Sequence, residues 1–252
     1  MLGFLTEPIF KPTLKMEIRN KKKPFNSFNF SRIQWFVHIV SWIPLLVIII
    51  DGFTNNLTFN PIQEISQRTG RIAAFWLTFS LSCTPLNSCI GLSALNPLRR
   101  PLGLYAALYA GLHFLIFVIL DLNLNFQQLF KTGVEKPFII LGSIALSILL
   151  MLTITSTSEW IKHLGKKWNQ LHRLVYLAGF LIMVHYLWAV KTPQGLPIIL
   201  SSIMAILLIL RIPLIRKWCK RHQPPWIKPF NRFLAGGKRM TPKISVSTNS
   251  KA

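Results

Sequence analysis

Four histidines (His38, His113, His172 and His185) lie within or beside uncharged stretches of the chain, where an ionisable side chain is costly. His185 lies in the run of residues 174–190, which contains no Asp, Glu, Lys or Arg, and His172 lies just before that run. His113 lies in a second uncharged run. Two neutral imidazoles that face each other across a helix bundle can ligate a six-coordinate b-type haem iron. We therefore predict that His113 and His185 bind haem b; the alternative is a structural hydrogen bond between helices.

The composition indicates a membrane protein. Of the 252 residues, 51% are hydrophobic and 14% are charged, whereas roughly 25% are charged in a soluble domain. The net charge of +22 is compatible with nucleic-acid binding, but the basic residues lie at the chain ends and in short segments between apolar runs. This distribution favours a lipid bilayer and argues against nucleic acid as a partner. Cys83, Cys89 and Cys219 form neither a metal-binding spacing nor an even disulfide set.

The elements that must position the histidines are six uncharged runs, most of them long enough to cross a bilayer as helices. We expect an all-α fold, a polytopic membrane helix bundle with six transmembrane helices, and we find no internal repeat. The bundle is placed at residues 33–215, between basic cytoplasmic tails of residues 1–32 and 216–252. The runs are residues 33–50, 72–98, 101–120, 137–158, 174–190 and 192–210.

The basic residues predict how the bundle is oriented. With six crossings, 24 of the 29 Lys and Arg residues fall on the side that holds both termini. Because cytoplasmic loops are enriched in Lys and Arg, both the N and C termini are expected in the cytoplasm. His113 then lies from mid-membrane to slightly outward and His185 lies in the outer half, so the two can share one depth.

A second group of residues is expected nearer the cytoplasm. His172 precedes His185 by 13 residues, which is roughly 20 Å along a helix, so any redox centre it binds is a separate, inner one. Arg99 and Arg100 lie at a similar depth; a guanidinium cannot ligate iron, but it can hold a haem propionate or a flavin phosphate. His38 lies near the inner side of the first run, where it either helps His172 to hold a cofactor or quinone or is satisfied by a neighbouring helix.

Several motifs occur in order along residues 32–218, at matching spacing. They are Thr69-Gly70-Arg71, Thr84-Pro85-Leu86, Arg99-Arg100-Pro-Leu-Gly103-Leu-Tyr105, Leu112-His113, Thr155-Ser156-Thr157, Leu164-Gly165-Lys166-Lys167-Trp168, Leu171-His172-Arg173 and His185-Tyr186-Leu187-Trp188. In these motifs the chain resembles the MsrQ (YedZ) family of the ferric reductase-like transmembrane superfamily.

The resemblance implies a haem b-binding, multi-pass subunit of the bacterial inner (plasma) membrane. Such a subunit passes electrons from a cytoplasmic flavin reductase or the quinone pool to MsrP, a periplasmic molybdopterin reductase that repairs oxidised methionine in proteins. FMN is also associated with the family. His113, His172 and His185 match the family's haem histidines. Arg99 falls where related oxidases keep a further histidine, which favours one haem over two.

No catalytic residues are predicted in the chain itself, so substrate reduction is expected on a partner protein. No G-x-G-x-x-G motif follows a strand, so the electron donor must be a separate protein or a quinol. Two alternatives remain. The same haem bundle could reduce ferric or cupric chelates, or the chain could be a haem-free six-helix transporter whose histidines relay protons.

Overall fold

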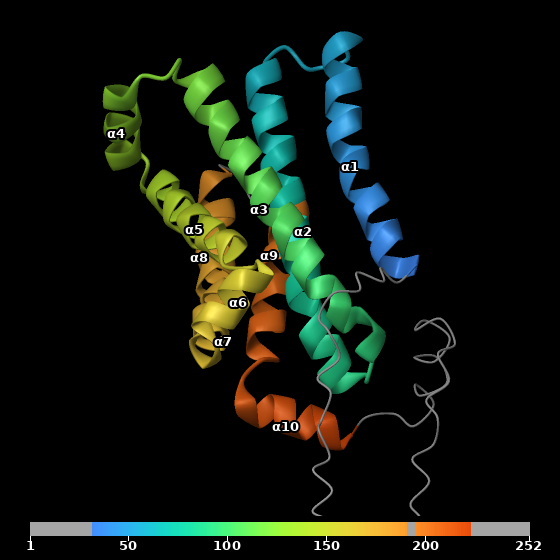
Figure 1. Cartoon of the computed structure of the whole chain (residues 1–252). Helices are drawn as coiled ribbons and strands as arrows, with labels where there is room; N and C mark the ends of the chain where they lie inside the picture. The colour runs from blue at the N-terminus through green and yellow to red at the C-terminus, as the bar shows by residue number, and fades with distance from the viewer. Residues whose placement is uncertain (1–31, 191–194, 223–252) are drawn as a thin grey trace, which may run out of the picture.

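The computed structural model describes residues 32–190 and 195–222 (Figure 1). Within these ranges the secondary structure is entirely helical, which confirms the all-α prediction. Residues 1–31 and 223–252, which make up most of the two expected basic tails, lie outside the described residues, as do residues 191–194.

Six longer helices correspond to the six uncharged runs. They are α1 (Arg32–Phe53), α2 (Pro61–Cys89), α3 (Arg99–Ile116), α5 (Pro137–Ile154), α8 (Leu174–Ala189) and α9 (Leu196–Ile209). Helix α2 begins earlier than its apolar run, because Pro61 at its first position and the Asn60 side chain, which accepts from the Gln63 N–H, start a helix well.

Not all of these helices are long and apolar enough to span a bilayer by themselves. Four segments of the described chain are long and apolar enough to do so: Ile33–Phe53, Leu95–Asp121, Pro137–Ile154 and Lys166–Ala189. A fifth follows if α9 and the helix after it, bent by 86° relative to each other, are taken as one broken span. Helix α2 does not qualify alone, although it lies in the middle of the bundle (Figure 1). The chain is thus a multi-pass membrane protein, and the count of six crossings stays a prediction.

Six short helices lie between or after the long ones. They are η1 (Ser93–Leu98), the π-helical turn η2 (Phe117–Asp121), α4 (Phe126–Glu135), α6 (Ser158–Leu164), α7 (Lys166–Leu171) and α10 (Pro213–Arg221). The links from α1 to α2 and from α3 to α4 lie at one end of the bundle, and α6, α7 and α10 lie toward the other (Figure 1).

Packing divides the bundle mainly into two helix pairs. Helix α2 packs most extensively on α3, and α5 packs most extensively on α8. Small buried residues, among them Ala106 in α3, Ala145 in α5 and Ala178 in α8, allow the helix backbones to approach closely. Helix α1 is attached to α3 by the buried Tyr109, whose hydroxyl donates to the Ser41 carbonyl at 2.6 Å. Each helix pair carries one of the two central histidines.

Candidate functional site

His113 and His185 meet between the two helix pairs. His113 lies in the last turn of α3 and His185 near the end of α8. Their ring centroids are 6.3 Å apart and the ring planes are inclined by 76°. Both side chains are partly buried. The two histidines therefore lie side by side, as expected, and their depth in the bilayer stays a prediction.

Each imidazole donates a hydrogen bond to a main-chain carbonyl of the neighbouring helix. His113 Nδ1 lies 2.8 Å from the carbonyl oxygen of Ser66 in α2, and His185 Nδ1 lies 2.7 Å from that of Phe138 in α5. A carbonyl can only accept, so Nδ1 carries the proton in both rings. The Nε2 atom of each ring then keeps its lone pair, which is the state of a metal-ligating histidine.

A glycine lies one helical turn after each carbonyl acceptor. A side chain at that position would cover the carbonyl, since residues four apart lie on the same helix face. A Cβ on Gly70 would lie 3.2 Å from Cε1 and Nδ1 of His113, and a Cβ on Gly142 would lie 2.8 Å from the same atoms of His185. Gly70 and Gly142 therefore admit the imidazole rings to the helix backbone.

The two sets of contacts have the same spacing along the chain. The acceptor carbonyl precedes its histidine by 47 residues in both cases, and the glycine follows the acceptor by four. The pairs α2/α3 and α5/α8 thus repeat one arrangement, although we found no internal repeat in the sequence. The first pair differs in having the π-turn η2 directly after α3, starting four residues after His113; such turns are frequent at functional sites.

The separation of the rings suits the binding of one metal ion between them. Metal–imidazole bonds are about 2.0–2.1 Å long, so two nitrogens on opposite sides of one ion lie about 4 Å apart. Adding the distance from each nitrogen to its ring centre gives centroids roughly 6 Å apart, close to the observed 6.3 Å. Two neutral imidazoles with fixed tautomers are the donor set of a six-coordinate haem iron, so the residues present fit this group.

His172 lies away from this pair, at the end of α7. Its Nε2 is 3.2 Å from the Thr155 hydroxyl, and its ring stacks on Trp168 with centroids 4.0 Å apart. Trp168 in turn donates from Nε1 to the Thr155 carbonyl at 2.9 Å. The structure therefore places His172 in a polar cluster where Trp168 of α7 meets Thr155 at the end of α5.

His38 and the two adjacent arginines also lie outside the central pair. His38 Nδ1 is 2.8 Å from the hydroxyl of Tyr105 in α3, so a neighbouring helix does provide a partner. Arg99 and Arg100, at the start of α3, are exposed, and their charges act on His172. No group of three or more His, Cys, Asp or Glu side chains suited to a metal ion occurs among the described residues.

Sequence reasoning missed the residues that orient the histidines. Ser66 and Phe138 act through main-chain oxygens, which every residue type possesses, so their side chains carry no signal. Gly70 and Gly142 were visible in the sequence, and their equal spacing to His113 and His185 could have indicated them. Arg211, which reaches the carbonyl of Leu81 in α2, was also not predicted.

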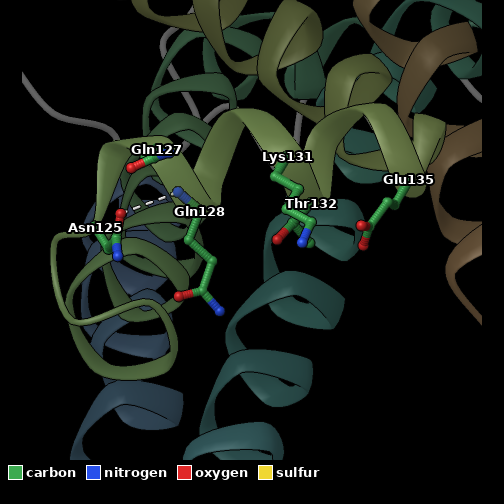
Figure 2. A pocket seen from close by; sticks show the side chains of 6 residues that line it. All are labelled: Asn125, Gln127, Gln128, Lys131, Thr132 and Glu135. Atoms are coloured by element: carbon green, nitrogen blue, oxygen red, sulfur yellow. Dashed lines mark hydrogen bonds between the residues drawn. The ribbon is translucent and has the colours of Figure 1, made fainter.

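A polar hollow on α4 lies outside the histidine site. Figure 2 shows the side chains that line it, all from α4 or its N-cap: Asn125, Gln127, Gln128, Lys131, Thr132 and Glu135. The opposite face of α4 exposes Phe126, Phe130 and Val134. This amphipathic pattern is typical of a helix that lies in the membrane interface.

Comparison with known proteins covers both helix pairs. A family model described as "Ferric reductase like transmembrane component" matches residues 69–184, which include His113 and His172 and end one residue before His185. No solved structure matches the chain.

Curated relatives match over a longer range. "Protein-methionine-sulfoxide reductase heme-binding subunit MsrQ" from Herminiimonas arsenicoxydans is 38% identical over 207 residues, which are 81% of this chain and 91% of the relative. Proteins with the same name from Pectobacterium atrosepticum and Xanthomonas euvesicatoria are each 35% identical, over 75% and 71% of this chain and 95% and 84% of the relative, respectively.

Proposed function

Because the chain belongs to the MsrQ family of ferric reductase-like membrane proteins, we propose that it is the haem b-containing electron-transfer subunit of a methionine sulfoxide reductase system. It would accept electrons from a cytoplasmic flavin reductase or the quinone pool and deliver them to an MsrP-like periplasmic molybdopterin reductase, across the bacterial inner membrane. The observation that carries the proposal is the pairing of His113 with His185, with both Nδ1 atoms bonded to carbonyls.

The two histidines would hold the haem from opposite sides through Nε2. When bound, haem would supply reversible one-electron redox chemistry at its iron, and ligation by both histidines would favour electron transfer over oxygen binding. The chain's own residues orient the ligands: the Ser66 and Phe138 carbonyls fix the tautomers, and Gly70 and Gly142 let the rings approach α2 and α5. Oriented ligands of fixed tautomer need little rearrangement during electron transfer.

The residues nearer the cytoplasm are proposed to serve the electron donor. His172, His38, Arg99 and Arg100 would form an inner binding region for FMN or a quinone, the arginines offering charge to a phosphate or carbonyl oxygen. A second haem there is disfavoured, because Arg99 stands where related oxidases have a histidine and Thr155 already lies within hydrogen-bonding distance of His172 Nε2. The proposed stoichiometry is one haem per chain.

The test is the haem spectrum of purified variants. His113→Ala and His185→Ala should each lose the reduced-minus-oxidised spectrum of low-spin haem b, with haem content falling to about a tenth or less, since a single axial imidazole holds the iron weakly. His163→Ala is the matched control, because His163 is exposed on α6. His172→Ala should keep the low-spin spectrum and one haem per chain. An unchanged spectrum in His113→Ala and His185→Ala, or a colourless wild-type protein, would refute the proposal.

The family model favours a second candidate function, the reduction of ferric chelates by the same haem bundle. The two candidate functions differ in the molecule that accepts electrons from the reduced protein. Under the main proposal, pre-reduced protein is reoxidised quickly by its periplasmic partner and slowly by ferric citrate.

A further inference from the structure

Arg211 joins the link between α9 and α10 to the middle helix of the bundle. Its Nη2 donates to the carbonyl of Leu81 in α2 at 2.8 Å. Pro85, four residues after Leu81, has no N–H, so this carbonyl lacks the usual helical donor. Arg211 supplies the missing hydrogen bond, which explains why the guanidinium of a residue in the link after α9 reaches α2.

That bond uses only part of the guanidinium. Its Nε and Nη1 atoms are buried and have no hydrogen-bond partner. One face of the group is covered by the ring of Tyr176 in α8, 4.5 Å from the guanidinium carbon. Arginine presents its N–H donors in a planar fork, and burial of such donors without acceptors is unfavourable. A further acceptor is therefore expected beside Arg211.

The surroundings favour an anion as that acceptor. Arg99 and Arg211 approach neighbouring residues of α2: the Ser80 hydroxyl donates to the Arg99 carbonyl at 2.7 Å, and Arg211 donates to the Leu81 carbonyl at 2.8 Å. The two positive charges therefore lie close enough to repel each other. The ion pairs in the described part of the chain involve only Arg68, at the opposite end of α2. Two neighbouring guanidinium groups without a carboxylate are stabilised by an oxyanion, and phosphate oxygens match the guanidinium fork.

We infer that Arg99 and Arg211 form a phosphate-binding site at the inner end of the bundle, where the start of α3, the C-terminal third of α2 and the link after α9 come together. The phosphate would come from the headgroup of an anionic phospholipid or from a water-soluble phosphate ester. The site shares Arg99 with the proposed inner binding region for FMN or a quinone and deepens that part of the proposed function by adding Arg211. It uses none of the histidines, so it would stand if the haem proposal failed.

The experiment compares the full-length wild-type protein with Arg99→Gln, Arg211→Gln and the control Arg216→Gln, since Arg216 is exposed on α10. Native mass spectrometry measures retention of phosphatidylglycerol against phosphatidylcholine. Thermal unfolding measures stabilisation by inorganic phosphate against chloride at equal ionic strength. Wild type and Arg216→Gln should retain phosphatidylglycerol or be stabilised by phosphate, and each of the other two variants should bind that anion at least about fivefold more weakly.

The two arms identify the source of the phosphate. Preferential retention of phosphatidylglycerol indicates a lipid headgroup, and stabilisation by inorganic phosphate alone indicates a soluble ligand. Equal binding by all four proteins, or no preference for either probe, would overturn the inference. Because Arg211→Gln also removes the bond to Leu81 and can unfold the protein, Arg99→Gln decides the result in that case.

Discussion

His113 and His185 take their tautomers from main-chain carbonyls, so no titratable side chain has to keep them in the ligating form. The sequence indicated both histidines, because a polar ring in an apolar run is conspicuous, and the rise per residue of a helix predicted that the two rings could meet. It could not indicate the carbonyl acceptors, which any residue provides, nor the position of Arg211, which depends on the bend after α9.

Adding a methyl group at Gly142 tests how the ring of His185 is positioned. The new Cβ would lie 2.8 Å from the ring, so Gly142→Ala must displace His185, at a cost of about 1–3 kcal/mol in the free energy of unfolding. We expect lower haem content or a shifted midpoint potential. Gly70→Ala, at 3.2 Å from His113, should have a smaller effect of the same kind.

The control for these glycine variants is Gly111→Ala in α3, where a Cβ meets nothing within 4 Å. This variant should keep the wild-type spectrum and gain about 0.5–1 kcal/mol in stability from its higher helix propensity. If Gly142→Ala matched Gly111→Ala in both haem content and potential, the close approach of His185 to α5 would have no role in positioning.

At the level of helices, the six apolar runs predicted the long elements well, because hydropathy sets where a chain can cross a bilayer. The shorter helices α4, α6, α7 and α10 were expected as loops or tail, since short polar or amphipathic helices form on contact with the bundle or the interface rather than from their own propensity. Helix α2 also extends well before its apolar run, as far as Pro61, and its polar first turns are attached to α1 and to the preceding loop.

The attachment of α1 to α2 should depend on pH. Glu64 accepts from the Thr58 N–H at 2.6 Å and pairs with Arg68, which also pairs with Asp51 of α1. The hydrogen bond from Thr58 is the main cause that lowers the pKa of Glu64 below its ordinary 4.5. A lowered pKa means that ionised Glu64 stabilises the fold above that value, and that this contribution is lost as the pH falls through the folded-state pKa.

We therefore expect the stability difference between wild type and Glu64→Gln to stay constant at neutral pH and to shrink as the pH falls below the ordinary pKa of 4.5. Thermal unfolding in detergent at several pH values, on both sides of 4.5, measures this difference. Glu135→Gln, which changes an exposed carboxylate on α4, is the control. A difference between wild type and Glu64→Gln that grew on acidification would contradict the assignment.

For the whole molecule, charge and hydropathy predicted a multi-pass all-α protein, the resemblance of its motifs indicated the family, and both are confirmed. The count of six crossings and the cytoplasmic location of the termini stay predictions, because α2 and α9 are less apolar or shorter than independent spans. The repeated arrangement of α2/α3 and α5/α8 was not visible in the sequence, since few of the equivalent positions keep the same residue type.

Reporter fusions test the orientation. A fluorescent protein fused at the C terminus should fluoresce, because that end is expected in the cytoplasm. Alkaline phosphatase should be active when fused after α4 and at least about tenfold less active when fused after α7, since the Lys and Arg bias places these helices on opposite sides. Active phosphatase after α7 together with inactive phosphatase after α4 would reverse the orientation.

The matching spacing of carbonyl, glycine and histidine in the two helix pairs has a consequence for the direction of electron transfer. Two groups positioned by the same means on both sides would give a haem site no intrinsic direction for electron flow. The direction would then be set by the donor and the acceptor that dock at the two ends of the bundle. The two halves differ 13 residues before each histidine, where one has Arg100 and the other has His172, so a docking donor would meet different groups there.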